Sequence, residues 1–353
     1  MSERILVYGA TGYTGRLIAG EAAARGLDVV LAGRNVERLK AVAEPLGLET
    51  RAFELADPAR LRAALEDVAA VLHVAGPFSA TAEPMVEACL ETRTHYLDVT
   101  GEIGVFEWIA RRDEAARAAG VVLLPGVGFD VVPSDCLAVH VAKRVGSPAT
   151  IRIAIAGVEG GVSRGTARTM VEALGDGLKL RRDGVLIKRR PGKLERHFDF
   201  GAGPVRALAM PLGDLSTAFH STGAPDIETY LVVSGALPRL IRATRYVLPL
   251  LRREPVQRFL KAQVDRMPEA PTRRRANDHA RSSTPRPSAR TATSRAIADT
   301  PSGYAFTRDA AVEAARRVAA GAVPAGFHTP GTAFGPDFLV ELPGCTRHDL
   351  DAG

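Results

Sequence analysis

The stretch Ile5-Leu-Val-Tyr-Gly9-Ala-Thr-Gly12-Tyr-Thr-Gly15-Arg-Leu-Ile18 decides the fold of the N-terminal third of the chain. Residues 4–9 form a short apolar run that ends in Gly9, which predicts a strand buried on both faces of a parallel sheet. Residues 14–25 have the apolar spacing of a helix, and Gly26 is a typical residue after a helix end. A strand, a glycine-rich turn and a helix in this order predict the first half of a βαβ unit.

The glycines of the turn have the spacing G-x-x-G-x-x-G. Gly9 permits a tight turn, Gly12 lets the backbone approach a pyrophosphate, and Gly15 allows the helix to pack closely on the strand. The phosphates would then meet free N–H groups at the positive end of the helix dipole. We therefore predict that this loop binds a dinucleotide. The other residues of the predicted loop are Thr11, Tyr13 and Thr14.

The alternation of strands and helices continues to residue 124. Strands are predicted at 28–33, near Ala52, and at 70–75, 96–99 and 121–124, and helices at 36–46, 58–65, 82–91 and 105–119. This alternation indicates right-handed βαβ crossovers. The expected fold class is α/β, a Rossmann-type doubly wound parallel sheet, in a first domain at residues 1–140.

The pattern changes after Ser134. Alternating Ile151, Ile153 and Ile155 predict a strand at 150–156 with one covered face. Further predicted elements are a helix at 166–174, a Lys/Arg-rich hairpin-like stretch at 178–200, strands at 228–233 and 338–342, and an Ala-rich helix capped by Thr307. We expect a second, α+β mixed-sheet domain at 145–345 that binds the substrate, with a C-terminal segment that returns to the first domain.

Length and composition are those of a globular enzyme with two domains. The chain has 353 residues, of which 46% are hydrophobic and 24% charged. Its three cysteines are far apart, which excludes a disulfide framework and a Cys-x-x-Cys metal site. Because no histidine pair or acidic cluster has the spacing of metal ligands, we expect no metal. The first residues lack the apolar segment of a signal peptide, so we expect a cytoplasmic protein.

Much of the net charge of +6 lies in residues 271–300, which contain seven Arg and two Asp. Since the rest of the chain is nearly neutral, we expect no nucleic-acid partner. The segment contains one large aliphatic residue, Ile297, and is predicted to be a poorly ordered loop. Residues 238–251 predict a basic amphipathic helix, which either packs on its own domain or makes a peripheral membrane contact.

The residues after the second predicted strand indicate which dinucleotide binds. An NAD site typically has Asp or Glu there, about 20 residues beyond the loop, to bind the ribose 2′-hydroxyl. This chain instead has Arg34 and Asn35, with Arg38 one helical turn later. Two guanidinium groups can hold a 2′-phosphate, which favours NADP(H). The alternative is that both arginines only solvate the start of a helix.

Other candidate residues follow the later strands, at the edge where open α/β sheets bind their ligands. Glycines there let the backbone come close to a nicotinamide ring. The predicted cofactor contacts at this edge are Gly76, Pro77, Phe78, Thr100 and Gly101.

A proton donor is expected among the polar residues at the same edge. The candidates are Glu102, Tyr96 and Asp130, and Glu102 is the first choice because it follows Gly101 at a strand end where partial burial suits an acid. The alternative is that Glu102 only faces the first turn of the next helix. Asp98, Asp130 and Ser134 equally suit helix caps and turns.

One motif suggests a different chemistry. Gly161-Val-Ser163-Arg-Gly165 matches the nucleophile elbow G-x-S-x-G, with His220 downstream as a base. The elbow needs a strand that runs directly into the serine, whereas Glu159-Gly160-Gly161 precedes Ser163. A serine hydrolase is therefore a remote alternative.

Together these residues resemble the saccharopine dehydrogenase-like oxidoreductases, in particular the bacterial branch with trans-acting enoyl reductases. The matching stretches of the first domain are Gly9 to Gly15, Ala32-Gly-Arg34-Asn35, Ala75-Gly-Pro77-Phe78, His95 to Glu102 and Pro125 to Asp135. Looser matches in the second domain are Pro211-Leu-Gly213-Asp214, Gly303-Tyr304 and Phe334-Gly-Pro-Asp337. The resemblance implies a Rossmann domain, a nicotinamide cofactor and an inserted mixed-sheet domain, and it leaves the substrate open.

Residues 271–300 depart from the family pattern, in which strand-forming sequence precedes Gly303-Tyr304. One hypothesis is that a pair of compensating frameshifts in a GC-rich gene produced this segment. Resequencing the gene tests it, since an unchanged reading frame rejects the idea.

We expect an NADP(H)-dependent oxidoreductase that transfers a hydride to or from a small molecule, with a lipid-like enoyl or carbonyl compound as one candidate class. A non-catalytic NADP(H)-binding or scaffold protein would carry the same loop and is the main alternative. The sequence leaves open the substrate, the proton donor and the oligomeric state, including a homodimer.

Overall fold

The computed structural model describes residues 3–156, 167–168, 171, 177–190, 192, 194–201, 203–232, 251, 253–266, 280–283 and 295–350. The chain divides into two compact units. The first comprises Met1–Val132 and Gly303–Phe334, and the second comprises Pro133–Ser302 and Gly335–Gly353. Each unit contains one sheet of its own.

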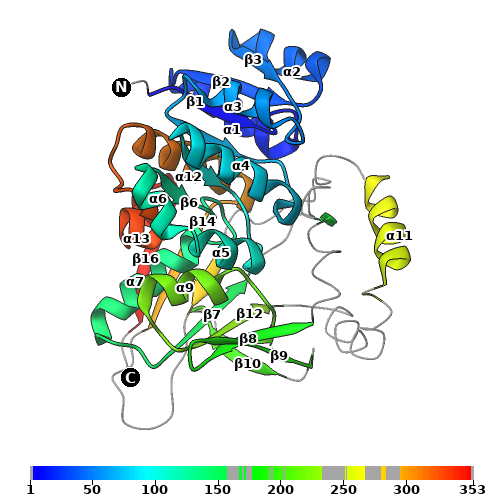
Figure 1. The fold of residues 1–353 in the computed structure, drawn as a ribbon. Coiled ribbons are helices and arrows are strands. Elements are labelled where there is room, and N and C mark those ends of the chain that lie inside the picture. The colour runs from blue at the N-terminus through cyan, green and yellow to red at the C-terminus, as the bar shows by residue number, and fades with distance from the viewer. Residues whose placement is uncertain are drawn as a thin grey trace. The chain divides into compact units, whose positions relative to one another are not determined.

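Seven parallel strands form the sheet of the first unit, in the order β15-β6-β5-β4-β1-β2-β3. Of these, β1, β2, β3 and β6 are labelled in Figure 1. Their bounds are β1 Ile5–Tyr8, β2 Val29–Gly33, β3 Glu49–Ala52, β4 Ala70–His73, β5 His95–Asp98, β6 Val122–Leu124 and β15 Gly326–Phe327. The strand order reverses between β1 and β4, which is the switch point where doubly wound sheets bind ligands. The predicted Rossmann-type fold is confirmed.

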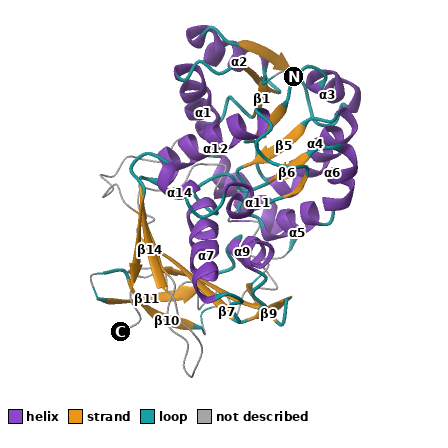
Figure 2. Ribbon diagram, turned by 90° about the vertical axis from the view of Figure 1, so that its left-hand side faces the viewer, coloured by secondary structure: helices purple, strands orange, loops and turns teal. Residues whose placement is uncertain are grey.

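Helices cover both faces of this sheet. Figure 2 shows α1 and α12 on one side of β1, β5 and β6, and α3, α4 and α6 on the other. The bounds are α1 Tyr13–Ala24, α2 Val36–Ala43, α3 Pro58–Leu65, α4 Phe78–Thr92, α5 Ile103–Ala110, α6 Asp113–Ala119, α12 Gly303–Ala319 and α13 Pro330–Phe334. Asn35 caps the start of α2, because its side-chain oxygen Oδ1 accepts a hydrogen bond from Arg38 N at 2.9 Å. Asp57 caps α3 in the same way, through Arg60 N at 3.1 Å.

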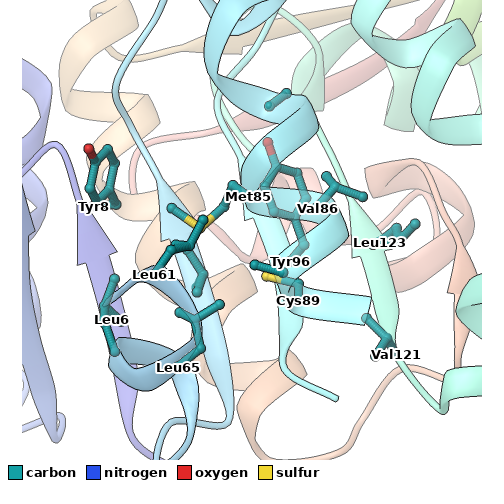
Figure 3. Packing of buried hydrophobic residues seen from close by; sticks show 14 of the residues in the cluster. Leu6, Tyr8, Leu61, Leu65, Met85, Val86, Cys89, Tyr96, Val121 and Leu123 are labelled. Carbon is teal, nitrogen blue, oxygen red and sulfur yellow. The ribbon is translucent and has the colours of Figure 1, made fainter. Parts of the chain in front are cut away.

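The core between the sheet and α3 and α4 is apolar and closely packed (Figure 3). Leu6 and Tyr8 point to the same face because successive strand residues alternate, and they meet Leu61 and Leu65 of α3. Met85 and Cys89 of α4 lie over β5 in the same cluster. Burial of such side chains stabilises a fold by about 1.5–3 kcal/mol each, so this packing fixes the strand ends that form the site.

The described residues of the second unit form a mixed sheet of nine strands, which confirms the predicted α+β domain. Its main path is β10-β11-β12-β7-β13-β14-β16, with β8 paired to β12 and β9. Strands β7 and β12 are parallel, and the other pairs are antiparallel. The strands are β7 Thr150–Ala156, β8 Leu178–Arg182, β9 Val185–Arg189, β10 Glu195–Asp199, β11 Pro204–Ala209, β12 Asp226–Val232, β13 Ala280–Ser283, β14 Arg295–Thr300 and β16 Thr346–Leu350. The helices are α7 Val132–Val145, α9 Asp214–Thr222, α11 Glu254–Asp265 and α14 Phe338–Glu341.

Two predictions for the second unit are wrong. Residues 338–342 were expected to form a strand, but they contain helix α14, in which the neighbours Phe338 and Leu339 are both buried. The poorly ordered loop predicted at 271–300 is wrong for residues 280–283 and 295–300, which form strands β13 and β14. Strand β14 lies between β13 and β16. Pairing on both edges buries Ala296, Ile297 and Ala298, so the sheet supplies contacts that local composition does not indicate.

Several helix boundaries in the first unit differ from the prediction. Helix α4 begins at Phe78, four residues before the predicted start, and α2 ends at Ala43, three residues before the predicted end. The helix expected at 105–119 is divided into α5 and α6 at Arg111 and Arg112. Thr307 was expected to cap a helix, but α12 begins at Gly303 and Thr307 lies inside it. The Thr307 hydroxyl donates to Gly303 O at 2.8 Å and accepts from Phe129 N at 3.0 Å, so it joins two segments instead of capping one.

Several predictions fall on residues outside those described. They are the amphipathic helix at 238–251, of which one residue is described, the Ser163 motif, most of the helix at 166–174, and residues 271–279 and 284–294 of the predicted loop. Within the described ranges, no helix is both long and apolar enough to cross a membrane.

Candidate functional site

The glycine-rich loop follows β1 and passes between the ends of β2 and β4. Gly9 has a φ of +92°, and a Cβ at this position would lie 2.9 Å from the backbone of Val74 and Ala75. Its N–H donates to Ala32 O at 2.9 Å. Only glycine fits a position with this φ and this contact, so the sequence G-A-T-G places the loop against the switch point of the sheet.

The start of α1 lies open toward this loop. A Cβ at Gly15 would lie 2.3 Å from Gly9 O, which shows how closely the helix approaches the loop. A Cβ at Gly12, by contrast, would have only Gly9 O within 4 Å among the described residues, at 3.4 Å. Gly12 is the N-cap of α1, and the helix has neither a side-chain cap nor an acidic residue in its first turn. The uncapped N–H groups and the absent Cβ fit a pyrophosphate.

The predicted 2′-phosphate residues lie at the end of β2. Arg34, Asn35 and Arg38 are all exposed, and Asn35 is also the cap of α2. Burial raises the pKa of the Tyr8 phenol, and the charge of Arg34 offsets part of this rise. Arg34 is therefore near the end of β1, beside the loop, where a 2′-phosphate would need it.

Asp98 connects the ends of β5 and β6. Its buried carboxylate accepts hydrogen bonds from Tyr96 Oη at 2.7 Å, Thr100 N at 2.9 Å and Gly126 N at 2.9 Å. Burial raises the pKa of Asp98 to about 7, against the opposite effect of these three hydrogen bonds. The sequence allowed Asp98 to be a cap or turn residue, and in this geometry its carboxylate joins the turns after β5 and β6.

Tyr96, a candidate proton donor, is fully buried beneath α4 (Figure 3). Its hydroxyl donates to Asp98, and burial raises the pKa of Tyr96 well above its usual value. Tyr96 therefore supports the site from below and is not exposed to a substrate.

Glu102 is half-buried at the start of α5, and its carboxylate faces α4. Its two oxygens accept from Phe78 N and Ser79 N, both at 2.8 Å. These are the first N–H groups of α4, so Glu102 caps that helix from a distance of 24 residues along the chain. Two N–H donors favour an ionised carboxylate, which suits a cap better than a proton donor.

Asp130 differs from the other two candidates because it is exposed, and desolvation by the surrounding atoms nevertheless raises the pKa of its carboxyl above the usual value. A Cβ at Gly101 would lie 3.3 Å from both its Cβ and its Oδ2. Asp130 and Gly101 are thus neighbours at the strand edge, with Thr100 buried behind them. Gly76 is exposed and Phe78 buried at the end of β4, where Gly76 and Pro77 are joined by a cis peptide bond.

Tyr304, in the C-terminal part of the first unit, lies at the glycine-rich loop, a position that the sequence alone does not predict. The ring of Tyr304, in the first turn of α12, packs edge-on against Tyr13 with 5.0 Å between centroids. Gly303 fits beside Phe129, where a Cβ would lie 3.1 Å from the ring. The family resemblance was the sole signal for Gly303-Tyr304, because no local pattern relates residue 304 to residue 13.

Ser134, the last of the predicted turn and cap residues, lies in helix α7 of the second unit. It is buried, and its hydroxyl donates to the Asp214 carboxylate. Among the residues that the structure describes, no three His, Cys, Asp or Glu side chains form a group that could hold a metal ion.

Comparison with known sequences agrees with this geometry. Residues 5–124 match the family described as the saccharopine dehydrogenase NADP binding domain. This part of the chain is thus similar to that family. The predicted resemblance is confirmed, and so is NADP(H) as the cofactor of the domain.

Several relatives match part of the chain. A trans-acting enoyl reductase from Mycobacterium leprae is 36% identical over 152 residues, which cover 40% of this chain and 36% of the relative. A saccharopine dehydrogenase-like oxidoreductase from Homo sapiens is 27% identical over 203 residues, which cover 50% of this chain and 47% of the relative. The matched part of this chain thus spans less than half the length of these relatives.

A solved structure extends the likeness to both units. Apo saccharopine dehydrogenase (L-Glu forming) from Saccharomyces cerevisiae aligns with a TM-score of 0.67 over 99% of this chain and 100% of that chain. The two sequences are 12% identical, so the likeness is one of fold.

The contacts of Gly15 give a prediction with a matched control in the same helix. Gly15→Ala should lower the free energy of unfolding by about 1–3 kcal/mol and weaken NADPH binding, because its Cβ would meet the loop backbone. Gly20→Ala, where nothing lies within 4 Å, should instead stabilise α1 by about 0.5–1 kcal/mol. Urea unfolding and NADPH titration of both variants measure this. Equal stability of the two variants would contradict the close packing at Gly15.

Asp98 gives a prediction about pH. A raised carboxyl pKa means that the native state keeps a proton that the unfolded chain has released, so this stability is present below the unfolded pKa, near 3.8, and is lost as pH rises through about 7. Relative to Asp98→Asn, the wild type should lose about 2–3 kcal/mol of unfolding free energy between about pH 5 and pH 8. The Asn side chain can still accept from Thr100 and Gly126 and donate to Tyr96. Urea unfolding at both pH values tests this, and a constant difference between the proteins would show that Asp98 is ionised throughout.

Proposed function

We propose that this protein is an NADP(H)-dependent oxidoreductase that transfers a hydride to or from a small-molecule substrate. The observation that carries the proposal is the uncapped N-terminus of α1 beside the three glycines, with exposed arginines at the end of β2. The match of residues 5–124 to an NADP-binding family supports it.

Each part of the site has a separate role in this proposal. The backbone from Gly9 to Gly15 binds the pyrophosphate, and Arg34 with Arg38 binds the 2′-phosphate. Gly76, Pro77, Thr100 and Gly101 lie at strand ends where the backbone can approach a nicotinamide ring. The bound cofactor supplies the hydride, and the chain's own residues orient it and deliver a proton.

For the substrate we propose a lipid-like enoyl or carbonyl compound. The support is the name of the Mycobacterium leprae relative, an enoyl reductase, which matches 40% of this chain. The alternative is a non-catalytic NADP(H)-binding or scaffold protein. It would bind NADPH and leave every enoyl and carbonyl compound unreduced.

Cofactor choice is tested at Arg34. The wild type should bind NADPH at least about tenfold more tightly than NADH, since charge-assisted hydrogen bonds to a phosphate contribute about 1.5–3 kcal/mol. Arg34→Asp should remove this preference and change NADH affinity little. Arg60→Asp, which removes an equally exposed arginine on α3, is the control and should keep the preference. Equal binding of NADH and NADPH by the wild type would reject the role of Arg34.

The proton donor is tested by comparing Asp130 with Glu102. We propose Asp130, because it is exposed beside Gly101 while Glu102 is bonded to the start of α4. Asp130→Asn should lower NADPH-dependent turnover by at least about a hundredfold with unchanged NADPH affinity. Glu102→Gln should lower stability by about 1 kcal/mol, as expected for a lost cap, and retain most of the turnover. Enoyl and carbonyl compounds are screened by the loss of NADPH absorbance, and the opposite pattern in the two variants would restore Glu102 as the donor.

A further inference from the structure

A buried glutamate on β12 holds three arginine side chains in the second unit. The Glu228 carboxylate is 3% exposed and accepts from Arg152 Nε at 3.0 Å, Arg196 Nε at 3.2 Å and Arg182 Nη2. Tyr230 Oη donates to the same carboxylate at 2.6 Å and accepts from Arg196 Nε at 2.9 Å. We call these five residues the Glu228 cluster.

The sheet places these residues on one face. Glu228 is the register partner of Arg152 on the parallel strand β7, and Tyr230 lies two residues further along β12. Arg182 comes from the end of β8 and Arg196 from β10. Four strands therefore contribute to a cluster that no stretch of the sequence shows.

The cluster carries an excess of positive charge. Burial alone would raise the pKa of Glu228, but the hydrogen bond from Tyr230 and the three guanidinium charges outweigh it and hold this pKa below its usual value. The neighbouring carboxylate and phenol raise the pKa of Arg196 despite its partial burial. One ionised carboxylate among three guanidinium groups leaves two positive charges close together, which repel each other unless an anion joins them.

Two of the arginines have N–H donors that are not used within the cluster. Arg152 and Arg196 use Nε toward Glu228 and Tyr230, and their Nη groups have no acceptor among the residues that the structure describes. The side chains are 16% and 40% exposed, so solutes can reach them. Since Glu228 fixes the orientation of each guanidinium group through Nε, the two Nη atoms of each group are oriented to make bidentate hydrogen bonds.

We propose that the Glu228 cluster binds an oxyanion, the phosphate or carboxylate group of a ligand, through the Nη groups of Arg152 and Arg196. Planar guanidinium forks match the oxygen spacing of both groups. A phosphate dianion would neutralise the two excess charges, and a carboxylate would neutralise one. This site lies in the second unit and does not depend on the proposed oxidoreductase activity.

The experiment measures anion binding by calorimetry on the full chain at constant ionic strength, with inorganic phosphate and acetate as probes. Saturating NADP⁺ is present in all samples so that the glycine-rich loop does not contribute. The wild type should bind phosphate saturably. Arg196→Lys keeps the charge but loses the fork and should raise the phosphate dissociation constant about tenfold, and Arg196→Gln should raise it further.

Arg206 supplies the matched control. It lies on the neighbouring strand β11 with a side chain 48% exposed, and its nearest acidic partner is Glu195 at 4.0 Å. Arg206→Lys and Arg206→Gln should bind phosphate like the wild type. Acetate binding that is lost with the same Arg196 variants would identify a carboxylate ligand, and acetate that fails to bind would identify a phosphate.

The outcomes separate this proposal from that of the oxidoreductase. Absence of saturable anion binding, or equal affinity in the Arg196 and Arg206 variants, would overturn the cluster as a binding site. NADPH affinity, measured in parallel, should be the same in all five proteins. If Arg196→Gln fails to fold, Arg196→Lys still decides the question, because the lysine keeps the positive charge beside Glu228.

Discussion

The close approach of backbone to backbone at Gly9 and Gly15 is the constraint on which the first unit depends. At both positions a Cβ would lie within 3 Å of main-chain atoms, from the residues that follow β4 in one case and from the loop itself in the other. Because these atoms cannot move independently of the sheet, the loop, α1 and the ends of β2 and β4 have one arrangement. That arrangement leaves the first N–H groups of α1 uncapped. The same geometry therefore fixes the fold and creates an anion-binding position.

The polar residues at the other strand ends accept hydrogen bonds from backbone N–H groups that have no partner in the sheet. Turns that follow parallel strands contain N–H groups without partners in the sheet, and burying them unpaired is costly. Asp98 satisfies Thr100 and Gly126, while Glu102 satisfies the start of α4. Acids at strand ends are also the residue types that catalysis uses, so their position alone does not separate the two roles. Solvent exposure separates the two roles, and among the three candidate proton donors it favours Asp130.

The sequence predicted the first sheet well because each βαβ unit is local. Strand and helix alternate within about 30 residues, so that hydrophobic period and turn residues are enough to place β1 to β6. It predicted the second unit less well because β7 pairs with strands as distant as β12 and β13. Residues 295–300 became a strand through such pairing, against their composition. At the site, the glycines and Arg34 were recognisable from their spacing, whereas the partners of Glu102 and the position of Tyr304 depend on contacts between distant segments.

The two units differ in how they hold their arginines. Arg34 and Arg38 are exposed at the edge of a sheet, where the guanidinium groups remain hydrated. In the Glu228 cluster, the guanidinium groups are fixed by a carboxylate that is itself almost fully buried. Burying a carboxylate is expensive, and well-packed apolar side chains in its place are often as stable or more stable. A gain in folding stability therefore does not explain an ionic cluster of this kind. Its physical advantage is pre-organisation, because a fork that is already oriented loses less conformational entropy when an anion binds.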